Sequence, residues 1–363
     1  MKRKKLPESA SKIAILILLS VSVCMCSQKK KNFTELNWKQ TVSDLDRSSL
    51  YEVNFKDGIY FNPWLQSDTE LIDALSWNMS AKMEYNENEI SFLPEVIPDS
   101  LSRVKNEKSD FMLWIGHQSY LIQLSGELFL LDPVLTKRAL VPARKTPPAL
   151  TISEINSLNR EVTVLITHNH YDHLDSETIR KLRIKKIIVP MGLGDYVKKL
   201  NDTQIIEMNW WSENFSDKGA SVISLPAQHW SNRFGFAKDS SLWCSYLLSS
   251  AGTVIYLGGD SGYFHGFREI GRKYKINYAV MSAGAYHPRW FMHYSHLNIE
   301  ESLLAFKDMK AEKYILGHWG TFKLGDEPAG YPAVDLKKLI DERKLPAEKY
   351  KIPDIGEMIL LEK

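Results

Sequence analysis

The chain has 363 residues, of which 44% are hydrophobic and 25% are charged, and its formal net charge is +2 at pH 7. These values are typical of a globular protein with one large domain or two ordinary ones, and they argue against a disordered or fibrous chain. A net charge this close to zero gives no strongly basic surface, so we expect no nucleic-acid partner.

Residues 1–26 differ in composition from the rest of the chain. Basic residues at positions 2–5 are followed by an apolar run from Ile13 to Cys26 and then by the polar stretch SQKKKN. A basic start and a short apolar run are typical of a secretory signal, and the run is shorter than the roughly 20 residues of a membrane-spanning helix. Its two closing cysteines resemble those of a bacterial lipoprotein signal. We predict an exported protein, periplasmic or membrane-anchored, with lipid on Cys24 or Cys26. An uncleaved anchor and a buried apolar segment are the alternatives.

Residues 27–108 contain scattered aromatic residues and many turn formers. The stretches GIYFNPWLQS and FLPEVIPDS predict loops and turns. Residues 71–83 predict one helix. We expect this part of the chain to be an N-terminal extension that packs on the core.

Residues 109–363 contain short apolar runs that alternate with turn residues. The runs FMLWIG, SYLIQL and ELFLLDP predict a strand meander, and residues 161–167 predict a further strand. Asp175 is a suitable N-cap for a helix with the sequence SETIRKLRI. Later strands are predicted at KKIIVP, SVISLP, LWCSYLLS, TVIYLGGD, YAVMSAG and KYILGHWG, and helices at residues 194–200, 266–274 and 299–309. This order indicates an α/β layered fold with a pair of partly parallel sheets.

The stretch HNHYDHLD, residues 168–175, contains three of the ten histidines of the chain. It fills the turn between a predicted strand and a predicted helix, and the carboxyl ends of strands are where open α/β sheets bind ligands. Imidazole and carboxylate groups are suitable ligands for zinc and similar divalent ions. We therefore expect metal ligands at His168, His170, Asp172 and His173.

Three other predicted strands also end on ligand types. His229 follows SLPAQ, Asp260 follows the two glycines of TVIYLGG, and His318 follows KYILG. Each of these alone is weak evidence, because such residues are common in turns. Together with the first four they predict a metal centre with seven ligands.

These residues resemble the metallo-β-lactamase superfamily and, within it, the N-acyl-phosphatidylethanolamine-hydrolysing phospholipase D family. The resemblance covers Phe111 to the C-terminus and rests on the motifs ITHNHYDHLD, PAQHWSNR, GGDSGY, GAYHPRWFM, GHWGTF, WIGHQSYLIQ and LLDP, with YFNPW upstream. It implies an αββα sandwich with a dinuclear metal site between two sheets.

The resemblance also implies a role for each ligand. His168, His170 and His229 would hold the first metal, Asp172, His173 and His318 the second, and Asp260 would bridge them. The expected cofactors are two divalent ions, in the first instance Zn²⁺, with a bridging hydroxide as the nucleophile. Asp172 would also orient that hydroxide. The expected catalytic residues are Asp172, Asp260 and His296.

Other positions have two interpretations each. His117, Arg289 and Tyr263 are candidate substrate-binding residues, and each is equally suited to a structural role. The aromatic stretches NWW (209–211) and RWFM (289–292) would contact acyl chains or pack in the core. Asp132 would support a ligand or close a turn.

The favoured hypothesis is a metal-dependent hydrolase of phosphodiesters, acting on N-acyl-phosphatidylethanolamine-type phospholipids at a membrane. A lactonase or another ester or amide hydrolase on the same fold is the alternative, and a non-catalytic surface binding protein is a third. The chain has His287, His293, Asn232 and Gln118 where relatives usually carry other residues. These departures leave the seven ligands intact, and they leave the substrate open.

Overall fold

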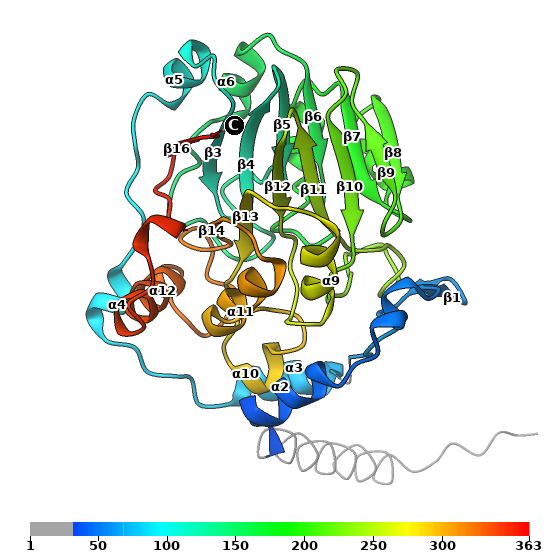
Figure 1. Ribbon diagram of the computed structural model, residues 1–363, viewed down its shortest axis with the longest axis vertical. Helices are drawn as coiled ribbons and strands as arrows, with labels where there is room; N and C mark the ends of the chain where they lie inside the picture. Colours follow the sequence, from blue (N-terminus) through cyan, green and yellow to red (C-terminus); the bar gives the residue numbers. More distant parts are fainter. Residues whose placement is uncertain (1–31, 68, 363) are drawn as a thin grey trace, which may run out of the picture.

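The computed structural model describes residues 32–67 and 69–362, so the predicted export segment lies outside the described residues. Two seven-stranded sheets face each other in the centre of the molecule (Figure 1). The first sheet has the order β16 (Met358–Leu360), β3 (Phe111–Gly116), β4 (Ser119–Leu124), β5 (Glu127–Leu131), β6 (Val162–Leu165), β7 (Lys186–Pro190), β8 (Gln204–Met208). The second has the order β15 (Tyr350–Lys351), β14 (Lys313–Gly317), β13 (Tyr278–Ser282), β12 (Thr253–Leu257), β11 (Ser245–Ser250), β10 (Ser221–Leu225), β9 (Glu213–Phe215).

Each sheet has an antiparallel half and a parallel half. In the first sheet β16, β3, β4 and β5 pair antiparallel, and β5 to β8 pair parallel. In the second sheet β9 to β12 pair antiparallel, and β12 to β15 pair parallel. Parallel neighbours need crossover connections, and helices supply most of them. The carboxyl ends of β6, β12, β13 and β14 therefore open into loops rather than tight hairpins.

Helices cover the outer face of each sheet. On the first sheet these are α6 (Ile152–Ser157), α7 (Ser176–Lys181) and α8 (Gly194–Leu200), which share a buried cluster with β3 to β7. On the second they are α9 (Gly266–Lys273), α11 (Ile299–Met309) and α12 (Tyr331–Glu342). The predicted αββα sandwich is confirmed.

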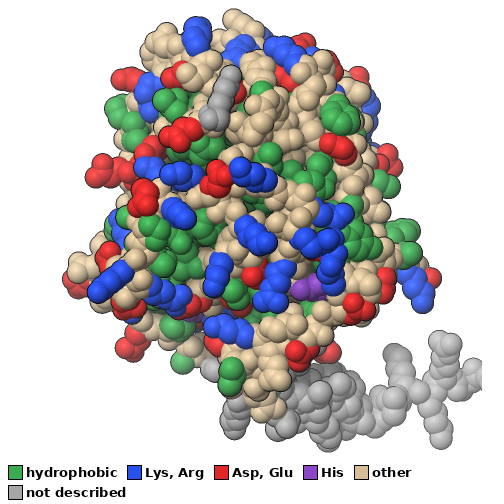
Figure 2. All heavy atoms as spheres, in the orientation of Figure 1, with side chains coloured by type: hydrophobic (Ala, Val, Ile, Leu, Met, Phe, Trp, Pro, Cys, Tyr) green, Lys and Arg blue, Asp and Glu red, His purple; other side chains and the backbone are tan. Residues whose placement is uncertain are grey.

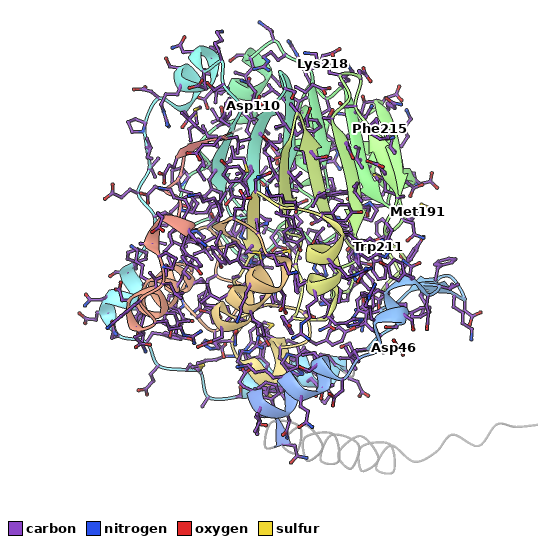
Figure 3. The ribbon with its side chains drawn as sticks, in the orientation of Figure 1. Asp46, Asp110, Met191, Trp211, Phe215 and Lys218 are labelled. Carbon is purple, nitrogen blue, oxygen red and sulfur yellow. The ribbon has the colours of Figure 1, made fainter. Side chains whose placement is uncertain are left out.

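Large side chains fill the space between the two sheets (Figure 3). Trp114, Tyr120, Phe129, Tyr246 and Leu257 are fully buried members of one hydrophobic cluster. Burying a side chain of this size contributes about 1.5–3 kcal/mol. This dry interior holds the strand ends, and the polar residues that follow them, in fixed positions.

The N-terminal extension packs on this body. It contains α2 (Glu35–Ser43), the 3₁₀ helix η1 (Arg47–Tyr51), β1 (Phe55–Lys56), β2 (Ile59–Tyr60), α3 (Leu71–Met79), α4 (Glu87–Ser91) and α5 (Ser100–Asn106). Its buried residues Trp38, Leu50 and Trp64 belong to the same hydrophobic cluster as the two sheets. The short segments α10 (Arg289–Met292) and η2 (Ala347–Lys349) complete the described elements.

Most of the expected elements are present at nearly the expected bounds. The helix expected at residues 71–83 ends at Met79, because Ser80 already has an extended backbone. The strand expected from Leu242 begins at Ser245, whose partner Leu225 is the last residue of β10. Six of the described α-helices were not expected, namely α2, α4, α5, α6, α10 and α12.

The surface in Figure 2 carries many Lys and Arg side chains over the face formed by α9 and α11, with Asp and Glu among them. Within the described residues, no helix is both long and apolar enough to cross a membrane.

Candidate metal centre and active site

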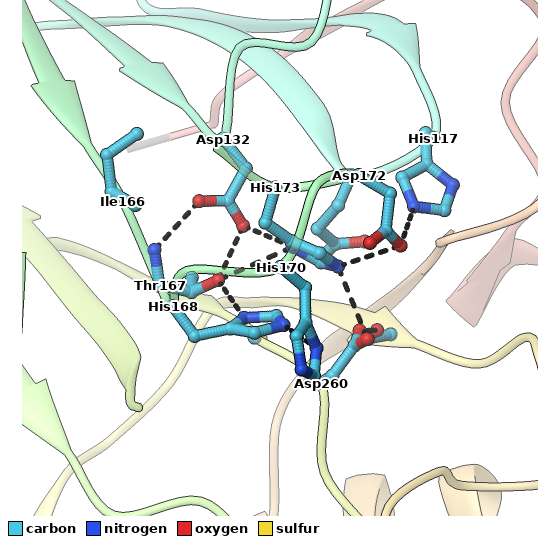
Figure 4. Close-up of polar contacts among 12 residues, drawn as sticks. His117, Asp132, Ile166, Thr167, His168, His170, Asp172, His173 and Asp260 are labelled. Atoms are coloured by element: carbon cyan, nitrogen blue, oxygen red, sulfur yellow. Dashed lines mark hydrogen bonds and ion pairs between the residues drawn. The ribbon is translucent and has the colours of Figure 1, made fainter. Parts of the chain in front are cut away.

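The turn between β6 and α7 presents four of the expected ligands in one place. The strand ends at Leu165, and α7 begins after Asp175, whose side chain accepts a hydrogen bond from the Glu177 backbone N–H (3.1 Å). This N-cap fixes the far end of the turn. Between these two points the side chains of His168, His170, Asp172 and His173 gather towards Asp260 (Figure 4).

Three histidines form the first ligand group. His168 Nε2 lies 2.9 Å from His170 Nδ1, and His229 Nε2 lies 3.2 Å from the same His170 nitrogen. The second ring nitrogens of His168 and His229 face Thr167 Oγ1 (3.0 Å) and the Ser295 carbonyl (3.0 Å). These outer contacts fix which nitrogen of His168 and of His229 faces the centre of the group.

Asp172, His173 and His318 form the second group. Both His173 Nε2 and His318 Nε2 lie 3.4 Å from Asp172 Oδ2. Asp260 lies between the two groups: its Oδ1 is 3.1 Å from His318, and its Oδ2 is 3.2 Å from His173 and 4.0 Å from His229. A carboxylate with its oxygens in these positions can bridge two cations.

The glycines before Asp260 explain how this residue reaches the centre. A Cβ atom at Gly258 would lie 2.7 Å from the Val280 carbonyl, and one at Gly259 would lie 2.3 Å from the Cys244 carbonyl. Only glycine allows the chain to pass this closely between its neighbours. Ser282 at the end of β13 then donates a hydrogen bond to Asp260 Oδ1 (2.7 Å).

Asp132 supports the second group from behind. It is fully buried, and its Oδ2 lies 2.7 Å from His173 Nδ1. It also accepts hydrogen bonds from the backbone N–H (2.8 Å) and the hydroxyl (2.6 Å) of Thr167. A carboxylate on the outer nitrogen of a histidine fixes the ring and makes it a better metal ligand. Of its two interpretations from the sequence, support of a ligand agrees with these contacts.

The electrostatics of the centre favour a bound cation. Burial alone would raise the pKa of Asp260, but attraction to His173 and His318 outweighs it and holds that pKa well below its usual value. Burial opposes the charged form of His318 as well, yet Asp260 and Asp172 raise its pKa to about 9. Two carboxylates thus draw positive charge into a buried space.

The remaining donors also fit a metal centre. Burial is the main cause that lowers the pKa of His168 and of His229 well below the usual value, so both rings are neutral, as metal ligands must be. The ring nitrogens His173 Nε2 and His318 Nε2 are buried and face the carboxylates of Asp172 and Asp260. These side chains therefore suit metal ions that take nitrogen and oxygen ligands.

A pocket of about 570 Å³ ends on this centre. His170, Asp172, Asp260 and His296 line its inner end, and His296 Nδ1 lies 3.7 Å from Asp260 Oδ2. Burial lowers the pKa of His296 to about 4, so its ring is neutral near pH 7. The rest of the wall is mainly apolar and includes Ala74, Trp77, Ala139, Leu140, Val141, Pro142, Trp230, Ala285, Phe291, Met292 and Leu324. Polar side chains also line it, namely Ser67, Thr69, Glu70, Tyr171, Asn232, Lys238 and Ser295.

Comparison with known proteins identifies the family. The family model for the beta-lactamase superfamily domain matches residues 128–319, which is more than half of the chain. The chain belongs to the metallo-β-lactamase superfamily. It is 31% identical, over 70% of its length and 76% of the relative, to N-acyl-phosphatidylethanolamine-hydrolyzing phospholipase D 1 of Caenorhabditis elegans. It is 28% identical, over 58% of its length and 84% of the relative, to a metal-dependent hydrolase of Ligilactobacillus salivarius.

A solved structure gives the same fold. The metallo hydrolase of Ignicoccus hospitalis superposes with a TM-score of 0.55 at 22% identity, over 70% of this chain and all of the other. Family membership and the His/Asp cluster together make this protein a metal-dependent hydrolase of the metallo-β-lactamase fold.

His117 lies beside the candidate metal ligands, although the sequence indicated only a substrate contact or a structural role for it. His117 follows β3 with a left-handed backbone (φ 54°), and its Nε2 lies 3.0 Å from Asp172 Oδ2. Its side chain is buried and, with Asp172, His173 and His318, belongs to a group that could hold a metal ion. Burial and the neighbouring His318 lower its pKa to about 3. His117 therefore contacts the candidate metal ligand Asp172, and it does not line the pocket.

Two further predicted substrate contacts lie outside the pocket lining. The Tyr263 hydroxyl donates a hydrogen bond to the Asp308 carboxylate, and its ring is 2% exposed. Arg289 contacts Glu35, Glu301 and the His296 carbonyl. Within the described part of the chain, the side chains of Tyr263 and Arg289 thus contact other protein residues and connect separate segments.

The two aromatic stretches are placed differently. Trp210 packs on Trp64 with ring centroids 5.2 Å apart, and Trp211 stacks on Tyr51 at 5.1 Å. The NWW stretch thus packs in the interior and against the extension. Phe291 and Met292 of the RWFM stretch line the pocket.

Sequence reasoning missed the part of the pocket wall that comes from other segments. Trp77 and Ala74 are supplied by α3, and Leu140 and Val141 by the loop after β5. Their apolar character is visible in the sequence, but no local pattern shows that these segments meet at the metal centre.

Proposed function

We propose that this metallo-β-lactamase-fold hydrolase cleaves the phosphodiester bond of a membrane phospholipid of the N-acyl-phosphatidylethanolamine type, in the manner of a phospholipase D, with two Zn²⁺ ions. The observation that carries the proposal is the apolar pocket that ends on Asp172, Asp260 and His296. Pockets of this volume with mainly apolar walls and a few polar groups at one end suit amphiphilic ligands. The name of the Caenorhabditis elegans relative supports the same substrate class.

The mouth of the pocket supports a membrane-bound substrate. Leu140 and Val141 line the pocket and are 61% and 73% exposed, and Phe234, two residues after the lining residue Asn232, is 94% exposed. Large apolar side chains that protrude beside a ligand site mark surfaces that meet lipid or another apolar partner. We infer that this rim rests on the bilayer from which the substrate enters.

The ligand groups and the pocket residues divide the chemistry. Bound divalent ions supply a water of lowered pKa as the nucleophile and positive charge for the phosphoryl oxygens. Asp172 belongs to both the ligand group and the pocket wall, so it can orient the attacking water. The neutral ring of His296 also lines the pocket and can hydrogen-bond a substrate oxygen. The apolar wall holds the acyl chains and excludes bulk water.

A substrate panel tests the proposal on the full-length protein loaded with zinc. N-acyl-phosphatidylethanolamine vesicles should release N-acylethanolamine and phosphatidic acid, and Asp260→Asn should abolish release. The other arms are phosphatidylethanolamine, phosphatidylcholine, a lactone series, simple esters and a β-lactam. Turnover of lactones or esters without turnover of any phospholipid would overturn the phosphodiester assignment. Bound metal with no turnover in any arm would favour a binding protein.

The proposal includes an exported, membrane-anchored location. It rests on the sequence of residues 1–26, which lie outside the described residues. Fractionation of cells that express the full chain should place the protein with membranes, and Cys24→Ala and Cys26→Ala should be compared one at a time. Release to the soluble fraction by one of them would identify the lipidated residue. A soluble, unprocessed wild-type chain would contradict the anchor.

A further inference from the structure

The segment from Arg289 to Asn298 touches the active site at two points. Its Ser295 carbonyl faces His229 Nδ1 at 3.0 Å, and its His296 ring lines the pocket 3.7 Å from Asp260. The segment consists of a four-residue helix, α10, and the loop that follows it. The position of both contacts therefore depends on what holds this segment in place.

Arg289 holds the segment to its surroundings. Its Nη1 donates a hydrogen bond to the carbonyl of His296 (2.9 Å), so the guanidinium ties the two ends of the segment together. Its Nη2 lies 2.8 Å from Glu301 Oε2, and its Nε donates to Glu35 Oε1 (2.8 Å). Three oxygens in three directions leave one orientation for a planar guanidinium.

The partners of Arg289 come from two distant parts of the chain. Glu301 is in the first turn of α11 and is buried, and it needs a cation beside it to carry a charge at low cost. Glu35 is the first residue of α2, which belongs to the N-terminal extension. Figure 1 shows α2, α3 and α10 together at one end of the molecule. Of these, α3 and α10 supply Ala74, Trp77, Phe291 and Met292 to the pocket lining.

Helix α2 and Phe33, which precedes its N-cap, add aromatic contacts to the same place. The Trp38 ring nitrogen donates a hydrogen bond to Glu301 Oε1 (2.9 Å), so the carboxylate of Glu301 is held from both sides. The ring centroids of Phe33 and Trp38 both lie 4.5 Å from that of His293, which is in the loop after α10. The extension thus covers the outer side of the segment whose inner side meets the active site.

We propose that Arg289 is a positioning residue and that α2, through Glu35 and Trp38, locks it. The N-terminal extension then acts on catalysis by fixing the backbone at Ser295 and His296, although α2 itself supplies none of the pocket lining. The proposal rests on the proposed function in one respect, which is that His296 contacts the substrate.

Hydrogen exchange measured by mass spectrometry tests the lock without a substrate. The full-length, zinc-loaded protein is compared with Glu35→Gln, which keeps the side-chain shape and removes the charge. The matched control is Glu52→Gln, since Glu52 is an exposed glutamate of the same extension whose side chain has no partner among residues 32–67 and 69–362. Amides of residues 293–298 should exchange about tenfold faster in Glu35→Gln and unchanged in Glu52→Gln, with equal zinc content in all three proteins.

Kinetics then test the consequence for catalysis. With a soluble phosphodiester or the phospholipid as substrate, Glu35→Gln should lower kcat about tenfold with KM within about twofold, because a small misplacement of a reacting group costs rate rather than binding. Arg289→Lys should show the same loss, because an ammonium cannot contact three oxygens in fixed directions. In a His296→Ala background Glu35→Gln should cause a clearly smaller loss of kcat than in the wild type, since one of the two groups that it positions is already gone.

Two results would overturn the inference. One is exchange at residues 293–298 that is equal in Glu35→Gln and Glu52→Gln. The other is a loss of kcat that is as large in the His296→Ala background as in the wild type, because α2 would then act through another route. If no substrate is turned over by any variant, the proposed function fails, while the exchange experiment still decides whether α2 locks the segment.

Discussion

At the scale of single residues, the metal centre depends on partners that hold the ligands rather than on the ligands alone. His168, His173 and His229 each use one ring nitrogen for the centre and the other for an oxygen of the protein. His117 meets the carboxylate of Asp172 in addition. These outer contacts fix ring orientation before any metal binds, which lowers the cost of assembling the site.

Asp132→Asn tests this dependence. Asparagine keeps the size of the side chain, but it places no negative charge beside His173 Nδ1, so the ring loses both its orientation and part of its basicity. We expect the affinity for the more weakly held zinc ion to fall about 10- to 100-fold. Zinc content after dialysis against a series of buffered zinc concentrations measures it. Asp57→Asn, at an exposed aspartate in the turn between β1 and β2, should bind zinc like the wild type. Equal affinities for all three proteins would contradict the role of Asp132.

At the scale of elements, strand ends and the contacts of the extension position the active site. The end of β12 passes close to the Cys244 carbonyl, and this close approach brings Asp260 to the centre. On the far side of α9, Glu269 binds Arg272 of the same helix and Arg47 and Tyr51 of η1. The close approach at Gly259 positions the candidate ligand Asp260. The contacts of Glu269 with η1 hold the N-terminal extension on α9.

Gly259→Ala should destabilise the protein and disturb the site. The new Cβ would lie 2.3 Å from the Cys244 carbonyl and 2.9 Å from Thr167 Cβ, so backbone must move. A cost of about 1–3 kcal/mol in the free energy of unfolding is expected, together with lower zinc affinity. Urea denaturation of the zinc-free proteins measures the first effect separately. Gly194→Ala is the comparison, because its nearest neighbour is the carboxylate end of Glu207, which can rotate away. The prediction fails if both variants lose the same stability.

The Glu269 contacts predict a pH dependence of stability. The hydrogen bond from Arg272 is the main cause that holds the pKa of Glu269 at about 2, below the usual 4.5, and Tyr51 and Arg47 add to it. A lowered folded-state pKa means that the stabilisation is fully present above about pH 4.5 and is lost as the pH falls towards 2. Glu269→Gln should therefore cost about 1–3 kcal/mol at pH 7, and less at pH 3.

Chemical denaturation of both proteins at pH 7, 4 and 3 gives this difference directly. Glu52→Gln, at an exposed glutamate without a side-chain partner, should show no difference at any pH. If the difference in the free energy of unfolding between wild type and Glu269→Gln stays constant down to pH 3, the ionised carboxylate of Glu269 is not the cause of the stabilisation.

At the scale of the whole molecule, the metal centre lies where the two sheets meet. Four ligands follow β6 of the first sheet, and His229, Asp260 and His318 follow β10, β12 and β14 of the second. Bound metals would therefore join the two halves of the sandwich. The same end of the molecule carries the pocket, α10 and the contacts of α2, so binding, catalysis and the extension converge there.

Metal removal should lower the melting temperature. A ligand at a thousand times its Kd stabilises the folded state by about 4 kcal/mol, which for a chain of this size corresponds to roughly 5 °C. Scanning calorimetry with EDTA, and again after zinc is restored, measures the difference. EDTA already saturated with zinc serves as the control. An unchanged melting temperature after proven zinc loss would show that the ions do not join the sheets.

Much of the site could be predicted from the sequence because each ligand has a local signature. His168 to His173 fill a turn between a strand and a capped helix, and Asp260 follows two glycines at the end of a strand. The helices at residues 194–200 and 299–309 have the expected bounds for the same reason. Helix α12 was missed because it begins in a stretch rich in glycine and proline. The apolar face of this helix can be recognised only from its packing against α11.

The roles of Arg289, His117 and Tyr263 could not be predicted in this way. Arg289 pairs with Glu35, which is 254 residues away in the sequence, and His117 meets Asp172 across 55 residues. An arginine or a histidine has the same local appearance whether it contacts a substrate or another part of the protein. The three-dimensional partners alone distinguish these cases.

The sequence by itself determined the succession of strands along the chain and the seven candidate ligands that follow them, and from these the family. Short-range patterns of apolar residues, caps and glycines specify where strands end, and this is why they could be recognised. The tertiary structure decided which residues support the candidate ligands from behind, the shape and apolar wall of the pocket, and the link from α2 to His296. These depend on contacts between segments far apart in the chain, and such contacts follow from the packing of the two sheets and not from any local pattern.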